Sequence, residues 1–328
     1  MDTISESALA DYLPASLVGG ELGQTDIPRI AKDPALKADL AQAVRSIPTH
    51  HALYCADSRE MTFLEPESVH LVLTSPPYWT LKQYESSDGQ LGHYADYDHF
   101  LEELDRVWQQ CYHALVPGGR VVCVVGDVCL SRRKNKGRHT VVPLHASIQD
   151  HCRQIGFDNL APIIWHKIAN AVYEAGGGGG FLGKPYEPNA VVKNDIEFIL
   201  MQRKPGGYRK PTEAARLLSV IAEEDHRQWF QQVWVGLTGA STKDHPAPYP
   251  VELAERLIRM FSFVGDTILD PFSGTATTSV AASRCGRNSI GVEVQPTYFE
   301  FALNRLEQSK QGLFGQTKVD AYPIGGRG

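Results

Sequence analysis

An alternation of short apolar runs with segments of helical periodicity limits the fold of this chain most strongly. Residues 69–73 and 120–125 are apolar enough for buried strands. Between them Asp96 can cap a helix, and apolar residues then recur at helical spacing, at Leu101, Leu104, Trp108, Cys111 and Leu115. Strands that alternate with helices predict an α/β fold, a mostly parallel sheet with helices on both faces. In such sheets ligands bind beyond the carboxyl ends of the strands, so we expect the chemistry there.

The same alternation continues toward the end of the sequence, whereas the first 50 residues differ from it. The pattern predicts further strands over 161–165, 196–201, 267–269 and 289–294, and helices over 144–155, from Pro250, over 276–285 and over 297–310. Pro117-Gly118-Gly119 is expected to stop the helix that Asp96 begins. Residues 1–50 contain one amphipathic helix, capped by Asp33 and begun by Pro34. We therefore expect a helical appendage over 1–50, packed on the main domain or on a partner.

Composition excludes several classes of protein. The net charge of -6 leaves no global basic field, so any binding of nucleic acid must use local basic patches. The six cysteines form no C-x-x-C pair and lie mostly in apolar runs, which indicates reduced core thiols and no metal site. No apolar run reaches the length of a membrane span, and Met1-Asp2-Thr3 begins no signal pattern, so we expect a cytoplasmic protein without membrane contact.

The segment Asp270-Pro271-Phe272-Ser273-Gly274-Thr275 follows an apolar strand and opens a helix. Small residues let the backbone approach a ligand, and a helix N-terminus favours electronegative groups. The next strand ends in Glu293, a position where a carboxylate commonly holds ribose hydroxyls. This segment and Glu293 together predict an adenosine-containing cofactor, but they do not distinguish one such cofactor from another. An ordinary tight turn is the alternative, and a NAD site would need a G-x-G-x-x-G loop that is missing here.

The second motif, Ser75-Pro76-Pro77-Tyr78, ends the strand over 69–73. Two prolines cannot continue a strand ladder, and they fix the direction of the Pro76 carbonyl beside the Ser75 hydroxyl. Tyr78 and the following Trp79 offer flat faces for stacking. Two acceptors and an aromatic plate suit a planar amine such as the edge of a nucleobase. A rigid turn with a surface aromatic remains the alternative.

Together the two loops resemble those of the DNA amino-methyltransferases, which combine a D-P-F-x-G-x-G-T-T cofactor loop with an S-P-P-Y or D-P-P-Y catalytic loop. The resemblance covers roughly residues 51–310, and the catalytic loop comes first, as in the β class. It implies a Rossmann-like methyltransferase fold, S-adenosylmethionine as the cofactor and double-stranded DNA as the substrate. It also implies a catalytic half over 51–169, a target-recognition region over 170–243 and a cofactor-binding half over 244–328. Dimers are common in this class, so a homodimer stays an open alternative.

The resemblance assigns a role to each motif residue. Ser75 and Pro76 accept hydrogen bonds from the amine of a flipped-out base, Pro77 keeps the loop rigid, and Tyr78 stacks on the ring. Glu293 holds the ribose, and Asp57 lies near the adenine. Further cofactor contacts are expected from Asp270, Pro271, Phe272, Ser273, Gly274 and Thr275, and from His245 and Pro246 in a segment that closes over the methionine end.

Two basic segments interrupt the alternation of strands and helices. One is a run without an acid, and the other follows a stretch of five glycines over 176–180. Solvated loops are one interpretation, and contact with DNA phosphates is the other. The expected DNA contacts are Arg132, Arg133, Lys134, Lys136, Arg138, Arg209 and Lys210.

Ser75 also bears on the choice of base. In this family S-P-P-Y is associated with N4 of cytosine and D-P-P-Y mostly with N6 of adenine. We therefore expect a cytosine-N4 methyltransferase, with adenine-N6 methylation as the alternative because serine and aspartate both accept from an amine. An inactive DNA-binding subunit is the non-enzyme alternative. Ala276 departs from the motif, which has glycine there. If Ala276 is the first helical residue, alanine is harmless there, whereas if the loop needs a positive φ at that position, alanine should weaken the cofactor's affinity.

Overall fold

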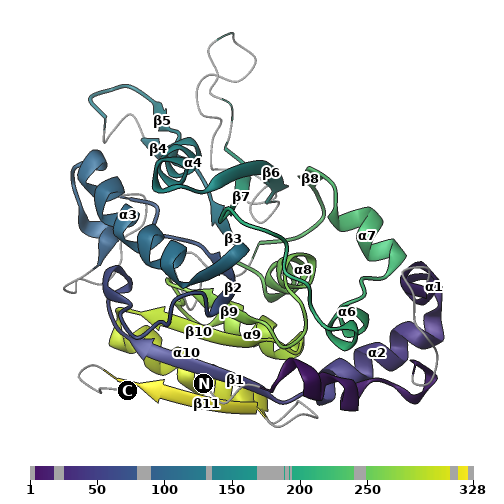
Figure 1. Cartoon of the computed structure of the whole chain (residues 1–328). Coiled ribbons are helices and arrows are strands. Elements are labelled where there is room, and N and C mark those ends of the chain that lie inside the picture. The colour runs from purple at the N-terminus through teal and green to yellow at the C-terminus, as the bar shows by residue number, and fades with distance from the viewer. Residues whose placement is uncertain are drawn as a thin grey trace.

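A nine-stranded sheet forms the centre of the part of the chain that the computed structural model describes (Figure 1). The structure describes residues 4–17, 26–79, 90–130, 135–167, 188, 192, 194–239, 249–310 and 317–323. The strand order is β11-β1-β10-β9-β2-β3-β7-β6-β8. The strands are β1 (Thr49–Cys55), β2 (Val69–Thr74), β3 (Leu115–Val125), β6 (Asp158–His166), β7 (Ile196–Arg203), β8 (Val233–Trp234), β9 (Thr267–Asp270), β10 (Asn288–Glu293) and β11 (Thr317–Tyr322).

Most neighbouring strands are parallel, as the sequence predicted. β11, β1, β10, β9, β2 and β3 run in one direction. β7 is antiparallel to both β3 and β6, and β8 is parallel to β6. β4 (Val128–Leu130) and β5 (Thr140–Val142) form a separate antiparallel pair. The carboxyl ends of the parallel strands therefore meet along one edge, called the carboxyl edge below, and their starts form the amino edge.

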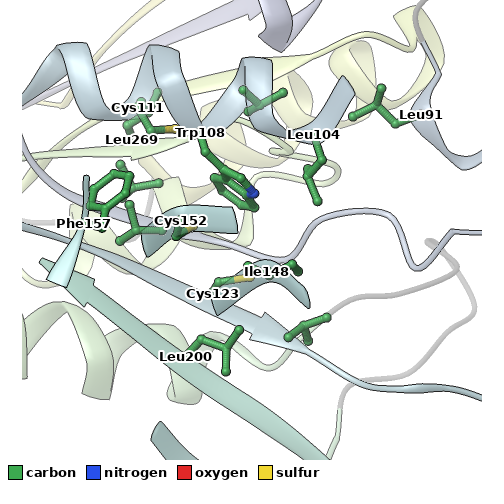
Figure 2. Packing of buried hydrophobic residues seen from close by; sticks show 14 of the residues in the cluster. Leu91, Leu104, Trp108, Cys111, Cys123, Ile148, Cys152, Phe157, Leu200 and Leu269 are labelled. Carbon is green, nitrogen blue, oxygen red and sulfur yellow. The ribbon is translucent and has the colours of Figure 1, made fainter. Parts of the chain in front are cut away.

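Helices cover both faces of the sheet. α3 (Tyr97–Ala114) and α4 (Leu144–Ile155) pack on one face, where Leu104, Trp108 and Cys111 meet Cys123 of β3 and Cys152 of α4 (Figure 2). α8 (Val251–Phe261) and α9 (Thr277–Arg284) cover the other face, and α10 (Pro296–Lys310) joins α9 against β1. The alternation of β2 explains both layers, because Val72 faces α3 while Leu71 and Leu73 face α8. Among these described helices none is long and apolar enough to cross a membrane.

The predicted N-terminal helix packs on the main domain. It is α2 (Pro34–Ser46), and the Asp33 side chain accepts from the backbone N–H groups of Ala35 and Leu36, so the predicted cap is confirmed. Its buried Leu36 and Leu40 belong to one apolar cluster with residues of α6 (Glu213–Leu218). The shorter helices nearby are η1 (Glu6–Tyr12), η2 (Ala15–Leu17), α1 (Asp26–Lys32) and α7 (Glu223–Trp229), and η3 (Ser58–Glu60) and η4 (Leu91–His93) lie elsewhere.

One predicted boundary is wrong. The helix that Asp96 caps ends at Ala114, and the Pro-Gly-Gly sequence lies inside β3 instead of between helix and strand. The β2–β3 pairing shifts register between Val69 and Leu71, so the extra residues of β3 are accommodated as a bulge. Gly118 has a φ of 79°, a conformation that favours glycine.

Candidate active site

The structure brings the two predicted loops together at the carboxyl edge. β2 ends at Thr74 and pairs with β9, which ends at Asp270, with Val72 opposite Leu269. The Thr74 hydroxyl donates to the Asp270 carboxylate at 2.7 Å. The residue before Ser75 is thus fixed directly to the first residue of the segment 270–275.

Asp270 connects three other parts of the chain as well. Its carboxylate accepts from the Thr278 hydroxyl at 2.5 Å, the Tyr249 hydroxyl at 3.2 Å and the backbone N–H of Phe272 at 3.1 Å. Burial raises the pKa of Asp270 above its ordinary value, and these hydrogen bonds act in the opposite direction. Asp270 was predicted as a cofactor contact, whereas its side chain is buried among protein donors. Sequence analysis did not assign roles to Thr74, Tyr249 and Thr278, because their convergence on one carboxylate depends on the fold.

Two residues with positive φ shape the turn from β9 into α9. Gly274 has a φ of 50° and Ala276 a φ of 59°. The backbone N–H of Ala276 donates to the Ser273 carbonyl at 2.8 Å. The N–H of Gly274 donates to the Glu293 carboxylate at 2.8 Å, and the N–H of Gln295 donates to its other oxygen at 2.9 Å. Burial raises the pKa of Glu293 to about 7.

This edge carries polar groups of the kind that bind an adenosine-containing ligand. Glu293 ends β10 and is paired with Cys55 at the end of β1, so Asp57 lies just beyond a neighbouring strand. The Ser273 hydroxyl is buried and has no hydrogen-bond partner among the described residues. A Cβ at Gly291 would lie 2.6 Å from that hydroxyl oxygen, so only glycine allows this close approach. The ends of β10 and β1 therefore bring Glu293 and Asp57 to the same edge of the sheet.

The surroundings of Asp57 are charged. Its carboxylate accepts from the backbone N–H of Arg59 at 2.9 Å and from the guanidinium of the same residue at 2.5 Å. Arg59 also pairs with Glu103 of α3. Pro271 receives a hydrogen bond from Ser58 at 2.5 Å, which ties the segment after β1 to the segment after β9.

The loop of Ser75 to Tyr78 is held differently. Pro76, Pro77 and Tyr78 are buried, and Ser75 is partly exposed. The Ser75 and Tyr78 hydroxyls lie 3.5 Å apart. Trp79 was expected to offer a stacking face, but its indole N–H donates to the Tyr94 carbonyl at 2.9 Å. Trp79 also packs edge-on against a tyrosine of α3, so it anchors the end of the loop.

Two pairs of polar side chains line the same edge beyond Tyr78. His145 and Asp127 are 2.6 Å apart, and the Lys167 ammonium lies 2.7 Å from the Glu197 carboxylate. A Cβ at Gly126 would lie 3.5 Å from the Tyr78 ring and 3.4 Å from Glu197, which places the second pair close to the tyrosine. Sequence analysis missed both pairs, although Asp127, Lys167 and Glu197 lie at or near the ends of predicted strands and His145 lies near the start of a predicted helix. No group of three or more His, Cys, Asp or Glu within the described ranges is placed to hold a metal.

The predicted DNA contacts are scattered. Lys136 and Arg138 lie between β4 and β5, and Lys210 is exposed. Arg209 lies at the amino edge, away from both loops, where it is 2.9 Å from Glu6 and also pairs with Asp266. The other predicted residues fall outside the described residues, namely Arg132, Arg133, Lys134, His245 and Pro246, together with the glycine run 176–180.

Comparison with known proteins places these features in a family context. The family model described as DNA methylase, of the N6 and N4 type, matches residues 69–304. A type II methyltransferase of Methanocaldococcus jannaschii, M.MjaI, is 36% identical over 277 residues, which cover 76% of this chain and 88% of the relative. M.MthZI of Methanothermobacter thermautotrophicus, also a type II methyltransferase, is 34% identical over 80% of this chain and 78% of its own length.

Solved structures agree with these matches. A Thermus thermophilus protein assigned as a DNA modification methylase, solved with S-adenosyl-L-methionine, is 48% identical with a TM-score of 0.70. The match covers 84% of this chain and all of that one. The cytosine-N4-specific PvuII DNA methyltransferase has a TM-score of 0.55 over 84% of this chain, at 18% identity, and shows likeness of fold alone.

Proposed function

Because the chain belongs to the N6/N4 family of DNA methylases and is an S-adenosylmethionine-dependent DNA methyltransferase, we propose that its target is N4 of cytosine. Ser75 is the observation that carries this choice, since the S-P-P-Y loop resembles that of the cytosine enzymes. The carboxyl edge supports this loop as the place of methyl transfer, because Thr74 and Asp270 join it to the turn at residues 270–275.

In the proposed reaction the target cytosine leaves the duplex, since its amine is not accessible while the base is stacked. The Ser75 hydroxyl oxygen and the Pro76 carbonyl accept hydrogen bonds from the two amine hydrogens. These bonds draw the nitrogen lone pair away from the ring and aim it out of the ring plane. S-adenosylmethionine, when bound, supplies a methyl group on a positively charged sulfur. The protein contributes positioning and electrostatic stabilisation.

Tyr78 completes the proposed base site. We expect its ring to stack on the cytosine, and in this structure the ring is buried beside Gly126. We propose that the side chain of Tyr78 turns to uncover that face, while the two prolines and the contact of Trp79 with Tyr94 hold the backbone of the loop in place.

The proposed cofactor contacts follow the strand ends. The Glu293 carboxylate accepts from the ribose hydroxyls, and Asp57 lies on the adenine side. Pro271, Phe272, Ser273, Gly274 and Thr275 line the site, and His245 and Pro246 close it. Asp270 fixes the two loops to each other, because its carboxylate already receives four internal hydrogen bonds.

For DNA recognition we propose the region 170–243, apart from β7, which is an internal strand of the sheet, and apart from Arg209 and α6, which lie at the amino edge. It directly follows β6, whose end lies at the carboxyl edge beside the Lys167–Glu197 pair. Lys136 and Arg138, between β4 and β5, are proposed to contact phosphates near the same edge.

The test is to incubate the protein with mixed-sequence duplex DNA and methyl-labelled S-adenosylmethionine. The DNA is then digested, and the labelled nucleoside is identified by mass. N4-methylcytosine is the expected product, and its absence with Ser75→Ala links it to this loop. Label in N6-methyladenine would overturn the choice of base and keep the family. Cofactor binding without label in any DNA would instead favour an inactive DNA-binding subunit.

A further inference from the structure

A cavity of about 530 Å³ opens at the amino edge, on the opposite side of the sheet from the two loops. It lies between α2, the residues after α6, and the last turns of α8 and α9. α9 begins at the carboxyl edge and runs back across the sheet, so its last residues lie far from the cofactor turn. This cavity is therefore separate from the proposed methyl-transfer site.

Its lining is strongly cationic, although the whole chain carries a net charge of -6. Five basic side chains and one acidic side chain line it: Lys37, Arg45, Arg259, Arg284, Arg287 and Glu255. Three of the basic groups have carboxylate partners at 2.6 to 3.3 Å, which are Glu224 for Lys37, Asp225 for Arg259 and Glu255 for Arg284. Arg45 and Arg287 have no carboxylate partner within the described part of the chain.

The excess positive charge is most unfavourable at Arg287, because this residue is buried. It is 2% exposed, and its guanidinium donates only to neutral oxygens, the carbonyls of Cys285 and Ser262 and the Ser262 hydroxyl. The two carbonyls end α9 and α8, so they supply only partial negative charge. Burial lowers the pKa of Arg287 to about 10. A buried cation without a counter-ion is unfavourable, and an anion in the adjoining cavity would relieve it.

The cationic lining continues into a second cavity of about 370 Å³. The two share Ser219 and Arg259, and the second adds Arg120 and Arg209. The Arg120 guanidinium lies over the Phe261 ring at 5.1 Å, and its Nε is buried without a hydrogen-bond partner among the described residues. Arg209, predicted as a DNA contact, thus belongs to this edge.

We propose that the 530 Å³ cavity is a phosphate-binding site on the face of the enzyme opposite the methyl-transfer site. Guanidinium groups match phosphate oxygens with paired hydrogen bonds, and Arg45, Arg284 and Arg287 come from different elements, so they can approach one phosphate group from several sides. The volume lies in the range of small-molecule sites. The phosphate belongs either to a free nucleotide or to a DNA strand.

The experiment compares the unchanged protein with two double variants. Arg45→Gln with Arg284→Gln alters the cavity. Arg29→Gln with Arg153→Gln removes the same charge from exposed ion pairs that do not line it. Inorganic pyrophosphate is titrated into each protein by calorimetry. The unchanged protein and the Arg29/Arg153 control should bind equally, and the cavity variant about 100-fold more weakly, at roughly tenfold for each lost charge-assisted hydrogen bond. No binding to the unchanged protein, or equal binding to both variants, would overturn the proposal.

Binding of a duplex at several salt concentrations identifies the source of the phosphate. If a DNA strand occupies the cavity, the cavity variant should lose about two units of salt-dependence slope relative to the control, near 0.9 for each phosphate contact. If a nucleotide occupies it, both slopes agree and only pyrophosphate binding differs. Methyl transfer at saturating DNA should be the same in all three proteins because both altered pairs lie away from the loops. Arg45→Glu alone is the control for misfolding. Because Arg45 is exposed, this substitution should weaken pyrophosphate binding without lowering Tm.

Discussion

The two loops at the carboxyl edge are both rigid, but different forces hold them. The cofactor turn at residues 270–278 is fixed by hydrogen bonds, with Asp270 accepting four and Glu293 accepting from the Gly274 N–H. The catalytic loop over 75–78 is fixed by two proline rings, and its serine hydroxyl makes a long contact of 3.5 Å to Tyr78. The first loop uses its polar groups internally, whereas the second is proposed to offer its acceptors to a substrate.

Because the two loops are held differently, substitutions in them should differ in their effects on the free energy of unfolding and on the rate of methyl transfer. A loop that proline rings hold can lose a polar atom without losing its shape. A loop held by buried hydrogen bonds leaves donors unsatisfied when one acceptor is removed, and buried unsatisfied groups lower the free energy of unfolding. Changes in the catalytic loop should therefore reduce the rate alone, and changes in the cofactor turn should also destabilise the fold.

Ser75→Ala should have the largest effect of all. We expect methyl transfer to fall about 10²- to 10³-fold, the effect typical of losing one positioned hydrogen-bonding group in an active site. The free energy of unfolding should change by less than about 0.5 kcal/mol, because the hydroxyl makes no short internal hydrogen bond. Single-turnover rates with saturating S-adenosylmethionine and urea unfolding measure the two quantities. A rate within threefold of the unchanged protein would show that Ser75 is not an acceptor for the amine.

Asp270→Asn, unlike Ser75→Ala, should lower the free energy of unfolding. The amide keeps one acceptor oxygen and adds a donor facing the Thr278 and Tyr249 hydroxyls. We expect a loss of about 2 kcal/mol in the free energy of unfolding, measured by urea denaturation. Thr74→Val is the matched control, because it removes only one donor to the same carboxylate and should cost about 1 kcal/mol. If Asp270→Asn left stability unchanged, the two loops would not differ as proposed.

Sequence analysis could predict that these loops meet, because both follow strands of one parallel sheet. It could not predict which donors surround Asp270, since Tyr249 and Thr278 lie on segments whose distance depends on how α8 and α9 pack. Arg209 illustrates the same limit, because its partner Glu6 is far away in the sequence. An ion pair between residues that are far apart in the sequence leaves no pattern that sequence analysis can detect.

β1 was missed for a different reason. It contains His50 and His51, which look unfavourable for a buried strand in a pattern that counts apolar residues. Both are buried, and a ring nitrogen of each contacts a neighbouring strand, His50 at 2.7 Å from Asp320 and His51 at 2.7 Å from Ser289. The other ring nitrogen of His50 has no hydrogen-bond partner among the described residues. A polar strand in the middle of a sheet can be recognised only when its partners are known.

The pH dependence of cofactor binding tests the proposed contact between Glu293 and the ribose. Ribose hydroxyls donate to the ionised carboxylate, and the pKa of Glu293 is raised to about 7 by burial. S-adenosylmethionine affinity should therefore rise as pH increases through 7, by roughly tenfold between pH 6 and pH 8 as the ionised fraction grows. Glu293→Gln should bind more weakly at pH 8 and lose this dependence in calorimetric titrations. A flat profile in the unchanged protein would contradict a ribose contact to this carboxylate.

Ala276→Gly should have the smallest effect, because opposing terms nearly cancel. Ala276 has a φ of 59°, which costs a non-glycine residue roughly 1–2 kcal/mol. Glycine would remove that strain but would lose roughly 0.5–1 kcal/mol through the entropy of the unfolded chain. It would also lose about 0.8 kcal/mol of burial, because the Ala276 methyl is 0% exposed and packs in a cluster with Leu53 and Val280. We expect a change in unfolding free energy within about 0.5 kcal/mol and a cofactor Kd within about twofold, both measured beside the unchanged protein. A Kd tenfold lower for the glycine variant would show that backbone strain, rather than packing, governs this turn.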